Sequence, residues 1–168
     1  KRRGITLLDA QKWMRERNYF AAMMVNEGEA DALITGYSRS YPSVVKPIMQ
    51  LIDKAPGVTR IATTNLMMTK RGPMFLSDTA INVDPSADDL AKIALMTART
   101  ARMFGVEPVI AMVSYSNFGS SQNASAVKVR EAVAYLHKYY PDLIVDGEIQ
   151  TDFALNSEML KDKFPFSK

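Results

Sequence analysis

Helix-type and strand-type patterns alternate along this chain, and the alternation is the strongest constraint on its fold. Apolar residues follow helical spacing after Thr6, Pro42 and Ser86, and a fourth helix is predicted to stop before Pro141. The runs between the helices are short and fit strands: 31–35, 58–64, 74–81, 109–114 and 143–145. The pattern predicts an α/β domain with a layered mixed sheet, helices on both faces and one antiparallel hairpin that turns at 69–72.

Two helix starts carry the same local signal. Thr6 and Asp9 have the spacing of a capping box, and the helix that they begin is predicted to run to Gly28. Ser86 and Asp89 repeat this spacing at the start of the best-defined helix of the chain. A serine or threonine and a carboxylate three residues apart satisfy two backbone donors that a helix start leaves unpaired.

The composition is typical of a folded domain. The chain has 168 residues, of which 47% are hydrophobic and 23% are charged, so one hydrophobic core is expected. Its apolar runs are far shorter than the roughly 20 residues that span a bilayer, and no membrane segment is predicted. The chain contains no cysteine, which excludes disulfides and thiol catalysis. We therefore expect a cytoplasmic location.

The charge distribution does not predict nucleic-acid binding. The net charge of +3 arises from 21 basic and 18 acidic residues, and a basic run occurs only at Lys1–Arg3. Nucleic-acid binding requires a clearer basic stripe with stacking aromatic residues. Because the chain begins without Met or a signal-type apolar region, we expect it to be a piece of a larger protein. The charged stretch 161–168 is expected to be a frayed terminal end or a lost domain boundary.

Several kinds of chemistry find no pattern in the sequence. His137 is the single histidine, so a histidine metal site or a serine–histidine–aspartate triad lacks its partners, and no catalytic or metal-binding residue is predicted. No glycine-rich fingerprint for a dinucleotide or a nucleoside triphosphate is present, so any NADP site must lie elsewhere in a larger protein. The eleven methionines, Met67 and Met68 among them, are expected mainly to fill the core.

Two loops that each follow a predicted strand are the candidate binding sites. The first, 36–41, adds a cation to hydroxyl groups, and Arg39 is equally well explained as an anion clamp or as a solvated charge. The second, 114–121, leads into a helix, where hydroxyls, free amides and the helix dipole suit a phosphate, although composition alone favours a plain turn and cap. The candidate residues are Tyr37, Ser38, Arg39, Ser40 and Lys46 for the first, and Ser114, Tyr115, Ser116, Asn117, Gly119 and Ser120 for the second.

At these loops the sequence resembles the phosphate acetyltransferase/phosphotransbutyrylase family. The likeness runs from about residue 4 to about residue 156 and includes the blocks NYFAAMMVNEGEADALITG, INVDPSADDLAKIA, VREAV and DLIVDGEIQTDFALN. Within the family, TGYSRSYPSVV and SYSNFGSS look like the version fused behind the catalytic region of NADP-dependent malic enzymes. The resemblance therefore implies the carboxyl-terminal regulatory domain of such an enzyme.

The sequence departs from the transferases at two positions of the first candidate site. Ser43 and Lys46 stand where transferases usually carry an aspartate and an arginine. The change at Ser43 removes a carboxylate, and a lysine lacks the bidentate fork of an arginine. By resemblance, the transferase's Ser-Arg catalytic segment lies beyond Lys168. These departures put transfer of acetyl groups to phosphate in doubt, and no complete active site is expected in this chain.

The resemblance also implies a fold. The family has the two-domain α/β architecture of isocitrate and isopropylmalate dehydrogenases. On that basis, residues 1–30 would end the first subdomain and residues 31–168 would form most of the second. The whole chain, 1–168, would be a fragment of a phosphate acetyltransferase-like domain.

The implied function is allosteric. Such a domain would bind acetyl-CoA or a related acyl-CoA and transmit inhibition to the malic enzyme catalytic domain of the same chain, which converts malate to pyruvate with NADP and Mg or Mn. The fragment itself would hold no cofactor, and homo-oligomers are implied. A fragment of an active phosphate acetyltransferase, which makes acetyl phosphate and CoA from acetyl-CoA and phosphate, and a purely structural oligomerisation domain are the alternatives.

Overall fold

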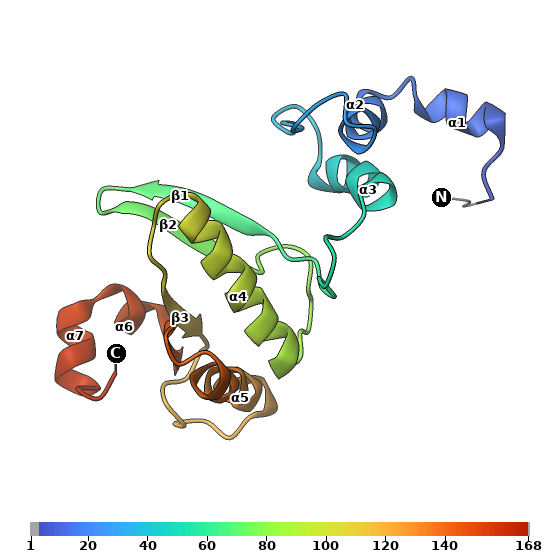
Figure 1. The fold of residues 1–168 in the computed structure, drawn as a ribbon. Helices are drawn as coiled ribbons and strands as arrows, with labels where there is room; N and C mark the ends of the chain where they lie inside the picture. Colours follow the sequence, from blue (N-terminus) through green and yellow to red (C-terminus); the bar gives the residue numbers. More distant parts are fainter. Residues whose placement is uncertain (1–3, 168) are drawn as a thin grey trace. The chain divides into compact units, whose positions relative to one another are not determined.

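The computed structural model describes residues 4–167, and its chain forms two compact units that divide between Thr59 and Arg60 (Figure 1). The basic run Lys1–Arg3 lies outside the described residues. This division does not test the boundary between the family's two subdomains. Its position after residue 30 stays a prediction. Within the described residues, no helix is both long and apolar enough to cross a membrane.

The first unit contains three helices: α1 (Leu7–Trp13), α2 (Arg17–Asn26) and α3 (Tyr41–Leu51). The capping box of Thr6 and Asp9 is confirmed at the start of α1. The prediction of one helix running to Gly28 is wrong, because the side chain of Glu16 accepts the backbone N–H groups of Asn18 and Tyr19 and begins a second helix there. The chain therefore turns between α1 and α2.

The predicted strand at 31–35 does not form. Ile34 is 98% exposed, and no strand is assigned anywhere in the described part of the first unit. A strand needs a neighbour to pair its backbone groups, and this run has none. The run is held instead by a side-chain contact, in which the hydroxyl of Thr35 donates to Oδ1 of the buried Asn18 on α2.

The second unit opens with the predicted hairpin. Strands β1 (Thr64–Thr69) and β2 (Gly72–Ser77) pair antiparallel from Thr64↔Ser77 to Thr69↔Gly72. The turn lies as predicted, but the predicted strand 58–64 is wrong except at Thr64, where β1 begins. The second strand, predicted at 74–81, begins and ends earlier, at Gly72 and Ser77. Asp78 has a φ of 58°, a left-handed conformation that ends the ladder immediately after Ser77.

The rest of the second unit alternates helices with two parallel strands. It contains α4 (Ala87–Met103), β3 (Val109–Val113), α5 (Ala124–Tyr139), β4 (Ile144–Ile149), α6 (Thr151–Leu155) and α7 (Ser157–Lys163). The capping box at the start of α4 is confirmed. Strands β3 and β4 pair parallel, so the mixed α/β class is confirmed. One mixed sheet was predicted, whereas the described strands form two separate two-stranded sheets. The layering of the dehydrogenases stays a prediction.

The core of the second unit lies between α4, α5 and the parallel strands. Small side chains on α4 let α5 approach closely, and Leu136 on α5 and Val145 on β4 are fully buried. Figure 1 shows α4 lying beside the hairpin, which contacts it through β2. The core residues are Ala91, Ala94, Ala98, Met112, Val129, Ala132, Val133, Leu136, Leu143 and Val145.

The prediction of a frayed end at 161–168 is wrong for residues 161–167, and residue 168 lies outside the described residues. Helix α7 continues to Lys163, and the rings of Phe164 and Phe166 lie 4.9 and 5.0 Å from that of Phe118. Aromatic ring contacts of this kind hold a segment whose charge pattern predicted a frayed end. Because Phe118 belongs to the second candidate loop, the end of the chain also packs against that loop.

Candidate functional site

The first loop, residues 36–41, is an open turn at the start of α3. Gly36 and Tyr37 both have positive φ, and the side chain of Tyr37 is fully exposed. Ser40 is the N-cap of α3, but its side chain makes no capping hydrogen bond. Its carbonyl instead accepts from the backbone N–H and the hydroxyl of Ser43. The hydroxyl groups of this loop are therefore solvent-facing.

Two unpaired cations belong to this region. Arg39 precedes the N-cap, Lys46 lies in the second turn of α3, and both are exposed. Within residues 4–167, neither side chain has a hydrogen-bond acceptor or an ion-pair partner. Because a free cation costs no existing contact when it binds an anion, both are available to a phosphate. Their convergence on one anion stays a prediction.

The second loop, residues 114–121, joins β3 to α5 and is tied to the end of β4. The N–H of Ser114 donates to the carbonyl of Ile149 at 2.9 Å, and that of Phe118 donates to the carbonyl of Glu148 at 2.8 Å. Parallel strands bring their carboxyl ends to the same edge, so the loop begins where β4 also ends. Phosphate groups bind at such edges in many α/β proteins.

A buried carboxylate, Glu148, lies beneath this loop. Its Oε1 accepts the Gly119 N–H at 2.8 Å and the Ser116 hydroxyl at 3.2 Å, and Nη1 of Arg130 lies 3.4 Å away. Glu148 is 0% exposed and Ser116 is 4% exposed. Ser116 therefore donates into the protein and is not available on the surface.

Asn117 is likewise used inside the protein. Its side-chain amide donates to Oε1 of Gln150 at 2.6 Å, and its Oδ1 accepts the Gln150 N–H at 2.7 Å. These paired contacts fasten the middle of the loop to the residue that follows β4. Of the predicted residues in this loop, Ser116 and Asn117 thus hold the loop in shape.

The loop also has fewer free amides than the sequence analysis assumed. The N–H groups of Asn117, Phe118, Gly119 and Ser120 all donate to acceptors within the protein. The reason is that Glu148 and a tight turn accept hydrogen bonds from these amides. The sequence alone does not show such partners. The groups that this loop leaves for a ligand are its exposed hydroxyl groups and the side chain of Arg130.

The outward groups of the loop are its phenol and hydroxyls. Tyr115 is 57% exposed, and its hydroxyl lies 2.8 Å from that of Ser121. Ser120 is exposed, and Asn123 caps α5 by accepting the Ser125 N–H. Arg130 reaches the same surface, with Nη1 3.4 Å from the carbonyl of Ser121. One cation and several hydroxyls thus face solvent at a helix start.

Sequence reasoning missed Glu148, Arg130 and Gln150. All three occur in the blocks VREAV and DLIVDGEIQTDFALN, which carry the family resemblance. Ser116 and Glu148 are 32 residues apart in the chain, so no motif of fixed spacing connects them. Only the pairing of β3 with β4 brings them together.

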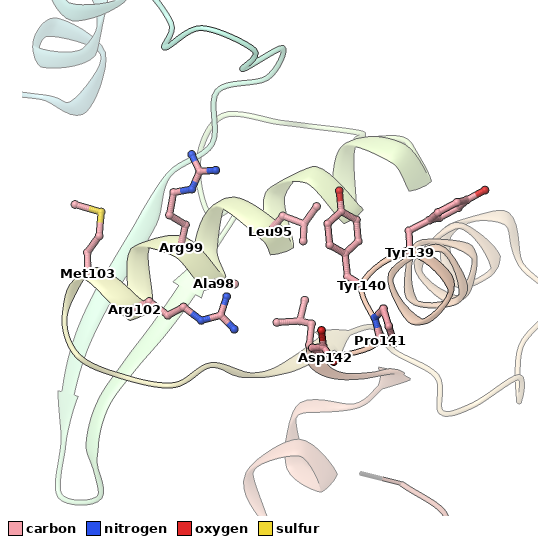
Figure 2. A pocket seen from close by; sticks show the side chains of 10 residues that line it. Leu95, Ala98, Arg99, Arg102, Met103, Tyr139, Tyr140, Pro141 and Asp142 are labelled. Atoms are coloured by element: carbon pink, nitrogen blue, oxygen red, sulfur yellow. The ribbon is translucent and has the colours of Figure 1, made fainter.

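Two open pockets among residues 4–167 are both lined by residues other than the predicted site residues. The first, of about 700 Å³, lies between the carboxyl-terminal half of α4 and the segment that follows α5, where Arg99, Arg102 and Tyr140 contribute to its wall (Figure 2). The second, of about 640 Å³, runs between β2, α4 and β3 and is mainly apolar. Both pockets belong to the second unit, and the candidate loops lie outside them.

The single histidine has a structural contact. Nε2 of His137 lies 2.7 Å from the carbonyl oxygen of Val145, so the side chain links α5 to β4. Among residues 4–167, no group of three or more histidine or carboxylate side chains is arranged to hold a metal ion.

The chain belongs to the phosphate acetyl/butaryl transferase family, whose model matches residues 1–168. Proteins of two kinds are among its relatives. It is 42% identical to an NADP-dependent malic enzyme of Salmonella typhimurium, covering 99% of this chain and 22% of that protein. It is 38% identical to a phosphate acetyltransferase of Synechocystis, covering 99% of this chain and 24% of that protein.

The fold agrees with this family. A phosphotransacetylase structure from Streptococcus pyogenes superimposes with a TM-score of 0.83 at 40% identity, covering 96% of this chain and 50% of that one. A second, from Staphylococcus aureus, gives a TM-score of 0.79 at 35% identity, covering 98% of this chain and 51% of that one. This chain spans about half of these solved chains and about a quarter of the longer relatives.

Proposed function

We propose that this chain is part of the regulatory domain of an NADP-dependent malic enzyme, in which it binds acetyl-CoA or a related acyl-CoA as an allosteric effector. One observation carries the proposal. Arg39 and Lys46 are exposed and unpaired within residues 4–167, whereas Ser43 stands where transferases, by resemblance, carry a carboxylate. The region keeps positive charge for a phosphate but lacks a group that the transferases use.

The proposed contacts follow from the chemistry of the ligand. Coenzyme A carries phosphate groups that accept charge-assisted hydrogen bonds, each worth about 1.5–3 kcal/mol. At the first loop, Arg39 and Lys46 would supply such bonds. At the second loop, taken by itself, the hydroxyls of Tyr115 and Ser120 and the Arg130 side chain would supply them. NADP and the divalent metal would belong to the malic enzyme catalytic domain of the same chain.

The experiment is a titration of the full-length protein. Oxidation of malate is followed with NADP and Mg²⁺ while acetyl-CoA is added, with CoA and inorganic phosphate as separate controls. We expect acetyl-CoA to lower the rate in a saturable way. A rate that does not respond to acetyl-CoA would contradict the regulatory function.

A second candidate function is that of an active phosphate acetyltransferase. Relatives with that name are 35–38% identical to this chain, close to the value for the malic enzymes. Because Ser43 and Lys46 replace the transferase-like aspartate and arginine, we expect no detectable acetyl-CoA from acetyl phosphate and CoA. Robust formation of acetyl-CoA by the full-length protein would favour this second function instead.

Assembly into homo-oligomers is part of the proposal. The hairpin exposes apolar side chains, among them Met67 at 45% and Met68 at 78% exposure, so these methionines do not fill the core of the unit as the sequence analysis expected. Exposed apolar patches mark interaction surfaces. We therefore expect this one to be covered in a homo-oligomer. Sedimentation of the full-length protein should show oligomers, and monomers at high concentration would contradict this.

A further inference from the structure

We propose that Glu148 is a positioning residue that fixes the second loop in the conformation that receives the effector. The inference rests on the proposed function for its ligand, but the loop-holding role depends only on contacts within the second unit. Glu148 is not assigned any contact with the ligand itself, because its side chain is fully buried. It would act through Gly119, Ser116 and Arg130.

The contacts of Glu148 all run toward the loop and the helix that follows it. Its Oε1 gathers the Gly119 N–H, the Ser116 hydroxyl and Nη1 of Arg130, while its backbone carbonyl accepts the Phe118 N–H. One residue at the end of β4 therefore holds three loop residues at once. Loops that lack such an anchor sample several conformations, and ligand binding must then order them.

The burial of this carboxylate makes its charge significant. Oε2 is buried without a hydrogen-bond partner among the described residues, so the charge is desolvated and incompletely compensated. Glutamine has the same shape and keeps an acceptor for Gly119, but its hydrogen bonds are weaker because they are not charge-assisted. Removing the charge should therefore loosen the loop while relieving a desolvation penalty. The looser loop should be seen as faster hydrogen exchange of the loop, and the relieved penalty as a change in overall stability.

Arg130 connects the buried carboxylate to the surface of the loop. Its side chain is 31% exposed, and its guanidinium reaches Glu148, the carbonyl of Ser121 and Oε1 of Gln122, each at 3.4 Å. Gly119 leaves room for it, since a Cβ there would lie 3.1 Å from Nη1 of Arg130. The same cation that faces the proposed ligand is thus oriented by Glu148.

The test compares Glu148→Gln with Glu131→Gln in the full-length protein. Glu131 is an exposed carboxylate on α5, so its replacement makes the same chemical change without touching the loop. Hydrogen exchange of peptides covering 114–121 reports the loop, and a titration with acetyl-CoA reports binding. We expect Glu148→Gln to speed loop exchange about tenfold and weaken acetyl-CoA binding about tenfold, and Glu131→Gln to change neither.

A role limited to overall stability gives a different result. Leu136→Ala removes a fully buried core side chain and should lower the unfolding temperature without a selective effect on the loop. If the affinity loss of Glu148→Gln merely followed stability, Leu136→Ala would show it too, and the proposal would be overturned. If Glu148→Gln does not fold, Arg130→Gln takes its place, with an expected loop effect of about threefold.

The outcomes separate this proposal from the proposed function. Unchanged loop exchange in both Glu148→Gln and Arg130→Gln overturns the positioning role. Faster loop exchange with unchanged acetyl-CoA affinity also overturns it, because the loop would then not receive the effector. If the unmodified protein binds no acetyl-CoA, the proposed function fails, whereas faster exchange in Glu148→Gln still supports the loop-holding role.

Discussion

The two candidate loops resemble each other in sequence but are held in different ways. The first, 36–41, is open and exposed, and its cation Arg39 has no partner within residues 4–167. The second, 114–121, is fastened from below by Glu148 and from the side by Gln150. Both contain serine, glycine and tyrosine after a predicted strand.

The difference shows what a strand ladder adds to a loop. The second loop follows β3, whose partner β4 brings acceptors to the loop's own amides. The first follows a run that forms no ladder, so it receives no such support. We infer that the first loop offers exposed charge, whereas the second loop has a fixed shape. The predictions below test this comparison.

The largest effect is expected from a matched pair of glycine substitutions. Gly147 on β4 and Gly36 in the first loop have φ values of 138° and 128°. A Cβ at Gly147 would lie 2.5 Å from the carbonyl oxygen of Met112, whereas one at Gly36 would meet nothing within 4 Å. We expect Gly147→Ala to cost about 4 kcal/mol and Gly36→Ala about 1–2 kcal/mol.

Hydrogen exchange of the full-length protein measures both effects. Amides of β3 and β4 should open much more readily in Gly147→Ala, and those of α3 should open only somewhat more readily in Gly36→Ala. If the amides near each substitution lost protection equally in the two variants, the second loop would not depend on the pairing of β3 with β4.

The second prediction concerns the charge of the first loop. Changing Arg39 to alanine should weaken acetyl-CoA inhibition of the full-length protein about ten- to hundredfold, because a charge-assisted phosphate contact contributes about 1.5–3 kcal/mol. Malate turnover without effector should be unchanged. Arg15→Ala, which removes another exposed cation of the first unit, is the control. Equal inhibition constants in all three proteins would mean that Arg39 is only a surface charge.

The third prediction concerns the fastening of the second loop. Asn117→Ala removes both hydrogen bonds to Gln150 and should cost about 1–2 kcal/mol, since a half-buried backbone donor loses its acceptor. Ser38→Ala, at an exposed position of the first loop, should stay within about 0.5 kcal/mol of the unmodified protein. Urea unfolding, monitored by hydrogen exchange, measures the loss of stability in each variant. A cost at Ser38 as large as that at Asn117 would contradict the comparison.

The smallest effect is a pH dependence that differs between the units. The side-chain hydrogen bond from Arg60, together with Ser86, lowers the pKa of Asp89 from 3.8 to about 2. Because the folded pKa lies below the unfolded one, the stabilisation is present above about pH 4 and is lost as the pH falls toward 2. The exposed Asp9 has its pKa lowered by Thr6 alone.

Asp89→Asn and Asp9→Asn test this in urea unfolding between pH 2 and 6. Asp89→Asn should be less stable than the unmodified protein at pH 6, and the difference should close by pH 2. Asp9→Asn should show a smaller difference at pH 6, since no arginine contributes there. A constant gap for Asp89→Asn across this range would show that the carboxylate charge is not responsible.

Much of the local structure was predictable from the sequence. Both capping boxes, the hairpin turn, α4 and the end of α5 before Pro141 were predicted correctly, because each depends on residues a few positions apart. The split between α1 and α2 was missed, since Glu16 caps a helix with a residue type that is not a usual N-cap. The family was also recognisable from long ordered blocks, and its model covers the chain.

The sequence alone determined the residue types, the local helix signals and the family. The tertiary structure decided which groups of the candidate loops remain free. Ser116 and Glu148 meet only because β3 and β4 pair in parallel, and the apparent strand at 31–35 fails only because no neighbour pairs with it. Capping and turn signals act over a few residues, whereas strand pairing and buried hydrogen bonds join residues that are distant in the chain.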